Sequence, residues 1–389
     1  MNKYIYILGL VGTALLSACS ADDLTMIPSS EEEESIVVEA GKDSDIPITL
    51  GVASGRGNTR AVLNSSADGN FETETGKYLG VFCLATGYQS PYEAEEMRPI
   101  ENDWTKDNGT CLLVRMNNVP AKVEGGNVAF MNLNATSEQN YYYPMGNWMK
   151  YNFYAYYPRQ EETVGGKTTL AITANQVLEK YYEIDGSQDI IWGMAVPPAD
   201  DAFSAKYFRE NVSAVIPQFS FDHKLVLFRF FVKAANTDVV NWGTQITDMY
   251  ISNAIYRLLL IVANKADASK NGQLSMMSSL QTKELGIKES GLDKNRFRDE
   301  DANGIVDSPL SITVVDPDVT SATPVGYILL APPSVSNDDN FEYTLVLKVN
   351  YDKGEGPTAK TLEYTLNPPS GGFTEGQVYN IVVSVNPEL

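Results

Sequence analysis

Histidine and cysteine are scarce in this chain, whose 389 residues contain one histidine and three cysteines. A zinc site of the HExxH kind needs two histidines and is excluded, and a Ser-His-Asp triad would have to use His223. The sequence also lacks a G-x-S-x-G elbow, a P-loop and a G-x-G-x-x-G loop. We therefore predict a protein that is not an enzyme and interpret His223 as structural. A glycosidase pair of carboxylates stays open, because its spacing depends on the fold.

Basic residues are also in short supply, with 29 Lys and Arg against 50 Asp and Glu and a formal net charge of -21. Nucleic acids and anionic lipid surfaces attract proteins that carry Lys- and Arg-rich patches. The charge balance therefore argues against nucleic acid as a partner, and we interpret the acidity as a source of solubility.

Long apolar runs are missing except at the N-terminus, where Lys3 precedes an apolar run from Tyr4 to Leu16. The run is too short for a stable membrane anchor and predicts a secretory signal peptide over residues 1–18. It ends in Leu16-Ser17-Ala18-Cys19, which resembles the lipobox of bacterial lipoproteins. The resemblance implies that Cys19 carries the lipid, including palmitate, that holds the chain on the outer membrane. The alternative is an ordinary cleavage site with an incidental cysteine.

The segment after Cys19 is rich in Ser, Asp and Glu, including Glu31-Glu32-Glu33-Glu34. Such a composition predicts a solvated, lipidated tether over residues 19–45. The two other cysteines, Cys83 and Cys111, would lie in an oxidising compartment after export, where they can pair as a disulfide. Buried free thiols are the alternative.

Short runs with alternating apolar residues, separated by turn residues, dominate the rest of the chain and predict a mostly β fold with antiparallel sheets. We expect strands in the segments 47–52, 78–84, 151–157, 224–233, 343–349 and 379–385, with a short helix over 279–287. The length favours two domains, which we place at residues 46–212 and 213–389.

Several of these segments, in this order, resemble the fimbrillin family of lipoprotein pilins, the Mfa-like or type V branch of Gram-negative anaerobes. Besides the lipobox, the matching pieces are Ile48-Thr49-Leu50 with Thr59-Arg60-Ala61, Phe71 before Gly80-Val81-Phe82, Tyr151-Asn152-Phe153-Tyr154-Ala155-Tyr156-Tyr157-Pro158, Asp189-Ile190-Ile191-Trp192-Gly193, Phe219-Ser220-Phe221-Asp222-His223-Lys224-Leu225 and Gly376-Gln377-Val378-Tyr379.

The resemblance implies two tandem β-sandwich domains of transthyretin-like topology and a role in cell adhesion and biofilm formation. It implies that a trypsin-like protease cuts the lipidated precursor after Arg60, or after Arg56, and removes the strand that contains Ile48, Leu50 and Val52. A strand of another fimbrial subunit would then take that place, as in other β-strand additions. The implied location is the surface-exposed outer membrane, and then the fimbrium, where the receptor is a glycan or protein of a host or bacterial surface.

Only Asn386-Pro387-Glu388-Leu389 follows the expected last strand, whereas stalk subunits of the family carry further strands. We therefore expect a tip or accessory subunit. The alternative function is a monomeric outer-membrane lipoprotein that binds glycans and keeps its lipidated Cys19. The run Tyr141-Tyr142-Tyr143-Pro144 near Trp148 is either an aromatic platform for glycans or part of the core.

An acidic loop from Asp299 to Asp307 matches the pattern D-x-D-x-N-G-x-x-D of calcium-binding loops. Its candidate ligands are Asp299, Asp301, Asn303 and Asp307, whose oxygens are of the hard kind that Ca²⁺ prefers. Leu310 stands where an EF-hand has its bidentate glutamate, so we expect no EF-hand. Calcium is the one cofactor for which the sequence gives a signal, and a solvated loop without metal is the alternative.

Overall fold

The structure is a computed structural model. It describes residues 43–53, 73–88, 104, 114–144, 149–160, 163–164, 167–168, 173, 175–195, 203–211, 215–290, 294–302, 305–315 and 323–388. The signal peptide, Cys19, most of the tether, Arg56, Arg60, Cys111, Trp148 and Asn303 lie outside these residues. Within them, no helix is long and apolar enough to cross a membrane.

Strands make up half of the described chain. In chain order the elements are β1 (Asp43–Pro47), β2 (Leu50–Val52), β3 (Leu79–Tyr88), β4 (Val114–Glu124), β5 (Asn127–Phe130), β6 (Tyr142–Pro144), β7 (Met149–Tyr157), β8 (Thr163–Val164), β9 (Lys167–Thr168), β10 (Val177–Glu183), β11 (Ile191–Ala195), α3 (Ala205–Glu210), β12 (Gln218–His223), β13 (Val226–Ala234), α4 (Thr237–Asn241), β14 (Gln245–Ile255), β15 (Arg257–Asn264), η2 (Ala268–Lys270), β16 (Leu274–Met276), β17 (Thr282–Gly286), β18 (Leu310–Ser311), β19 (Gly326–Leu330), η4 (Pro333–Ser336), β20 (Thr344–Tyr351), β21 (Thr358–Thr365) and β22 (Val378–Val385).

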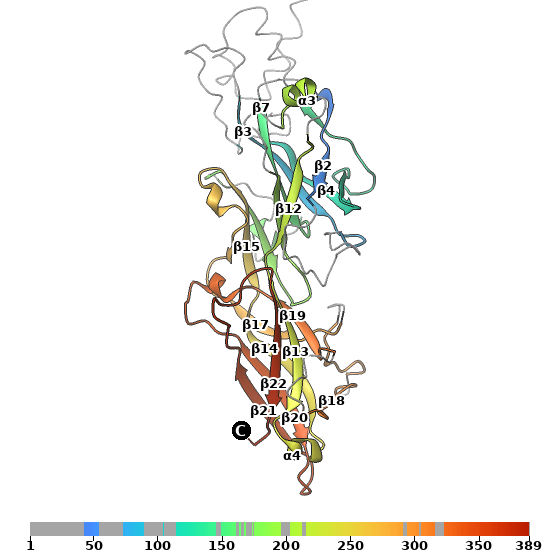
Figure 1. The fold of residues 1–389 in the computed structure, drawn as a ribbon, viewed down its shortest axis with the longest axis vertical. Coiled ribbons are helices and arrows are strands. Elements are labelled where there is room, and N and C mark those ends of the chain that lie inside the picture. The colour runs from blue at the N-terminus through green and yellow to red at the C-terminus, as the bar shows by residue number, and fades with distance from the viewer. Residues whose placement is uncertain are drawn as a thin grey trace, which may run out of the picture.

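The main sheet of the N-terminal half is closed by hydrogen bonds into a barrel, with the strand order β11-β12-β2-β5-β4-β3-β7. It forms the upper part of the elongated molecule in Figure 1. Nearly every residue of β7 from Tyr151 to Tyr157 is buried, as expected for a strand with apolar side chains on both faces. Gly80 in β3 shows how tight the packing is, because an added Cβ would lie 2.3 Å from the Tyr156 ring.

The C-terminal half contains two sheets of its own, one in the order β19-β13-β22 and one in the order β17-β14-β20-β21, with β18 paired to β14. Phe228 of β13 packs edge to face on Tyr343 and on Phe373, so side chains from the facing layers interdigitate. Arg229 and Lys233, on the other side of β13, are only half-buried. This alternation is the one predicted for the segment 224–233.

A third sheet, in the order β10-β15-β16, lies at mid-height between the two halves (Figure 1). Buried apolar side chains form one cluster with members from both halves. The barrel's last strand ends at His223 and β13 begins at Val226. Hydrogen bonding also connects β10 of the first half to β15 of the second, and the domain boundary at residue 212 stays a prediction.

The prediction of a mostly β fold is confirmed, whereas two local predictions are wrong. The helix expected over 279–287 is strand β17, because Leu285 points into the core and the segment pairs antiparallel with β14. The tether expected up to residue 45 ends sooner, because β1 begins at Asp43 and pairs with β6. In both cases a partner strand far away in sequence decides the local structure.

Candidate functional site: the N-terminal strands and the groove they fill

Strand β2 is short, yet it lies in the interior of the barrel sheet. It runs parallel to β12, with Gln218 opposite Gly51, and antiparallel to β5, with Leu50 opposite Val128. A strand with neighbours on both sides closes the barrel. Its departure would leave β5 and β12 each with an open edge.

Backbone hydrogen bonds hold this segment on both sides. Gly51 N–H donates to Pro217 O at 2.9 Å, and Ala53 N–H donates to Phe219 O at 2.9 Å. On the opposite side, Val52 N–H donates to Gly126 O at 2.9 Å. These bonds use main-chain atoms, so any segment with the same backbone conformation could form them.

The side chains of the segment fill the core. Ile48 and Leu50 are 4% and 1% exposed, and Val52 is half-buried against the same cluster. Burial of side chains of this size stabilises the fold by roughly 1.5–3 kcal/mol each. The three residues named by the sequence analysis are therefore the ones that anchor the segment.

Among the described strands, β1 pairs with one, whereas β2 pairs with two. The partner of β1 is β6, and Ile48 N–H continues the pairing to Tyr141 O at 2.8 Å. Its ion pair between Asp45 and Arg209 spans 3.5 Å, and the Asp45 side chain is 84% exposed, so the pair contributes about 0–1 kcal/mol. The stability of the segment 43–53 therefore comes mainly from backbone pairing and apolar burial.

His223, the single histidine, is buried at the end of β12 and forms a close contact through Nδ1 with the buried carboxylate of Asp189. Burial alone lowers the pKa of His223, but the charge and the hydrogen bond of Asp189 outweigh it and raise the pKa. The pair joins the end of β12 to the segment that precedes β11. Because both groups are buried, the arrangement fits the structural role predicted for His223.

The acidic loop brings three of its four candidate ligands together. One carboxylate oxygen each of Asp299, Asp301 and Asp307 lies within 4.8 Å of the others. Glu300 N–H donates to Asp307 Oδ2 at 2.6 Å, which draws the two ends of the loop together. Carboxylates this close repel one another unless a cation neutralises them. The geometry fits a hard cation such as Ca²⁺.

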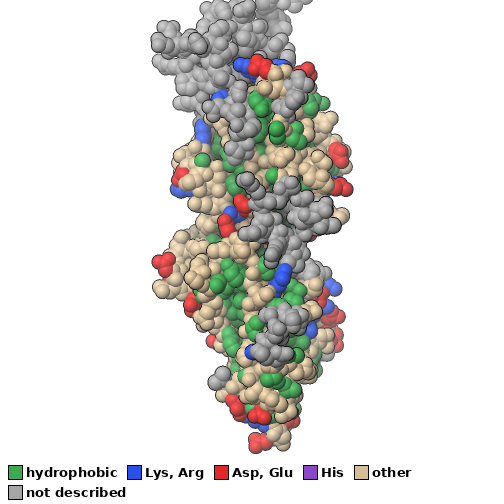
Figure 2. Space-filling view, in the orientation of Figure 1, with side chains coloured by type: hydrophobic (Ala, Val, Ile, Leu, Met, Phe, Trp, Pro, Cys, Tyr) green, Lys and Arg blue, Asp and Glu red, His purple; other side chains and the backbone are tan. Residues whose placement is uncertain are grey.

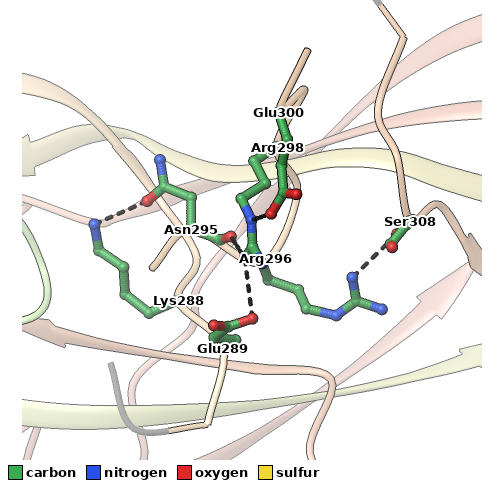
Figure 3. A network of polar contacts seen from close by, with 7 residues as sticks. All are labelled: Lys288, Glu289, Asn295, Arg296, Arg298, Glu300 and Ser308. Carbon is green, nitrogen blue, oxygen red and sulfur yellow. Dashed lines mark hydrogen bonds and ion pairs between the residues drawn. The ribbon is translucent and has the colours of Figure 1, made fainter. Parts of the chain in front are cut away.

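A network of polar contacts supports the base of this loop (Figure 3). Arg298 donates to Glu300 through Nε at 2.6 Å and to Glu289 through Nη1 at 3.0 Å. Lys288 donates to Asn295 Oδ1 at 2.8 Å. These contacts fix the position at which the loop leaves the sheet.

The other candidate residues from the sequence are Cys83 and the tyrosines at 141–143. Cys83 is a buried free thiol, and burial raises its pKa, so it stays protonated. Tyr143 is buried and packs on Phe208 and Phe153, which makes it part of the core. Tyr141 and Tyr142 are half-buried.

Lys180 was not predicted from the sequence as a residue of interest. It is fully buried on β10, and its ammonium lies 5.1 Å from the Phe82 ring centre and 5.4 Å from that of Tyr156. Burial lowers the pKa of Lys180 to about 7, with a smaller contribution from the charge of Arg159. The alternation of β10 carried the signal, because Lys180 shares a face with the buried residues Leu178 and Tyr182.

No protein-family model and no curated protein matches this chain. Among solved structures, it is similar to a proposed cell adhesion protein from Bacteroides uniformis, with 17% identity and a TM-score of 0.40, over 87% of this chain and 94% of that one. It is also similar to a proposed cell adhesion protein from Bacteroides eggerthii, with 10% identity and a TM-score of 0.39, over 89% of this chain and 88% of that one.

Proposed function

We propose that this protein is a cell-surface adhesion protein of a Gram-negative envelope, a fimbrial subunit made as a precursor lipidated on Cys19 and assembled by β-strand exchange. The observation that carries the proposal is the position of β2, which fills an interior place of the barrel although it is the second described strand of the chain. A cut after Arg60 or Arg56 would separate this strand covalently from everything that follows.

The position of β2 supports strand exchange after a cut in the chain. The segment 43–53 would then be held only by non-covalent contacts, and its loss would expose the pockets of Ile48 and Leu50 and the edges of β5 and β12. Open edges beside apolar pockets are strong sites for strand addition. An incoming strand from another subunit would regain the same backbone bonds and fill the same pockets.

Replacement of the cleavage residues tests this proposal in cells. In the double variant Arg56→Gln/Arg60→Gln, we expect the full-length lipidated precursor to accumulate and surface polymers to disappear, because β2 cannot leave. Immunoblots of unheated and heated surface extracts would show the loss of the polymer ladder. The single variant Arg56→Gln serves as the control and should still be processed if Arg60 is the cut site.

A normal polymer ladder in the double variant would refute assembly by release of this strand. The rival function, a monomeric glycan-binding lipoprotein, predicts that wild type and variant are identical and that both keep Cys19. The position of the subunit along a fimbrium, tip or accessory, stays a prediction.

A bound calcium ion in the loop 299–307 is a second part of the proposal, supported by the convergence of Asp299, Asp301 and Asp307. A site filled to 100 times its Kd would stabilise the fold by about 2.7 kcal/mol. We expect 5 mM CaCl₂ to raise Tm by several degrees over EDTA, and Asp301→Asn/Asp307→Asn to abolish the rise. Differential scanning calorimetry of both proteins measures this. Equal Tm values with and without calcium in the wild type would show that the loop is merely solvated.

A further inference from the structure

A cleft of about 1140 Å³ lies away from β2, between the end of the barrel and the C-terminal half. Its walls come from β11 and β12, from the turn between β15 and β16, and from the segments 332–342 and 368–375. Clefts that hold ligands concentrate where separately folded parts of a chain meet, and sites for small molecules measure about 300–1,000 Å³. The cleft is as large as the upper end of that range, so it has room for a segment of polypeptide.

Negative charge dominates the charged side chains that line the cleft. The carboxylates are those of Asp222, Asp338, Asp339, Glu342 and Glu375. Among the described residues that line the cleft, Lys224 supplies the single ammonium. It already forms an ion pair with Glu375 at 2.7 Å, and its own side chain is only 6% exposed. A cleft lined by one sign of charge between protein walls focuses the field and concentrates ions of the opposite sign.

Apart from the loop with Asp299, Asp301 and Asp307, acidic side chains are spread out on the face shown in Figure 2. In the face shown in Figure 2, Asp and Glu are scattered along the whole molecule and interleaved with Lys and Arg. In the cleft, by contrast, five acidic residues line one concave space, where a single ligand can contact several of them. Several charges acting together also contribute more than isolated surface pairs.

Aromatic side chains give the cleft an apolar component. Trp192 is half-buried, its indole N–H donates to Val262 O at 2.9 Å, and one face of its ring packs on Gly272. Phe341 is half-buried and packs edge to face on Tyr343, with ring centres 5.2 Å apart. Aromatic rings beside carboxylates suit cations with long methylene stems, because the ring face attracts the cation and the stem covers the ring edge.

We propose that this cleft binds an extended peptide segment rich in lysine or arginine. The site lies apart from the groove of β2, so it would provide a contact with a basic partner that does not depend on strand exchange. The attraction is electrostatic at long range, so binding weakens as salt is added.

Calorimetric titration of the whole protein with a pentalysine amide at 50 mM salt tests the proposal, with the fully acetylated pentalysine as the uncharged probe. The cleft variant Asp338→Asn/Asp339→Asn/Glu342→Gln removes three exposed carboxylates, and Asn at 338 keeps the oxygen that accepts the Asn340 N–H. Glu375 is left intact because its loss would free Lys224. The control Glu124→Gln/Glu138→Gln/Glu363→Gln removes three exposed carboxylates outside the cleft.

We expect the cleft variant to weaken pentalysine binding at least tenfold, the control to weaken it less than threefold, and the acetylated peptide not to bind. Equal weakening by the two variants would overturn the proposal, because attraction to the overall negative charge would then explain binding. Failure of pentalysine to bind the wild type, or equal binding of both peptides, would also overturn it. Matching Tm values would show that both variants are folded.

Discussion

Replacement of Leu50 by aspartate is expected to lower the free energy of unfolding by more than about 4 kcal/mol, a loss large enough to unfold many proteins of ordinary stability. Leu50 is 1% exposed and belongs to the apolar core, so a carboxylate there would lose its water inside a cluster of apolar side chains. Urea unfolding of the uncut protein, followed by circular dichroism and tryptophan fluorescence, measures the effect.

The matched control is Gly51→Ala on the same strand. A Cβ at Gly51 would meet its nearest atoms at 3.5 Å, an ordinary contact distance, and the backbone there is not left-handed. We therefore expect Gly51→Ala to change the free energy of unfolding by less than about 1 kcal/mol. If Leu50→Asp were as mild as this control, β2 would not be a structural strand, and its removal could not open a groove.

Replacement of Lys180 by methionine is expected to stabilise the protein by about 2–4 kcal/mol at pH 7, which is unusual for a substitution in a core. The pKa of Lys180 is lowered from its ordinary value of 10.5 to about 7, because burial disfavours the charged form. Its contacts with Phe82 and Tyr156 recover part of the cost. Methionine has a similar length and no charge, so it can fill the same space.

The lowered pKa of Lys180 also predicts how the stability of the protein depends on pH. Between pH 7 and about 10, the unfolded chain keeps the Lys180 proton and the folded protein releases it, so stability should rise with pH over this window. Below pH 7 the folded protein keeps the proton, so the full free-energy cost of burying the charged Lys180 is present. In Lys180→Met the rise should vanish, whereas Lys233→Met, at a half-buried position of β13, should keep it. Urea midpoints at pH 6, 7, 8 and 9 decide the matter, and parallel profiles for wild type and Lys180→Met would contradict a buried ammonium.

Strands could be predicted from the sequence because alternation is local. In β7 and β13, the apolar or polar character of a side chain indicates how buried its position is. The predicted ends of both strands are therefore within a few residues of the observed ends. The segment from Pro47 to Val52 was predicted as one strand. In the structure the pairing changes at Ile48, where β1 leaves β6 and β2 enters the barrel. The partner of a strand is a tertiary property that alternation does not contain.

Sites that join distant segments could not be predicted for the same reason. Asp189 and His223 are 34 residues apart in the sequence. The acidic cleft combines residues from Trp192 to Glu375. The acidic loop was found because its candidate ligands are close in sequence. When the residues of a site lie within one short segment, the site can be located from the sequence alone.

The most direct test of strand release is the N-terminal sequence and intact mass of the protein taken from the surface of its own cells. The account predicts a chain that begins at Ala61, or at Gly57, without lipid and without the segment 43–53. A chain that begins at an acylated Cys19 and still contains Leu50 would contradict it, and the protein would then be an anchored binding protein or an uncleaved base subunit.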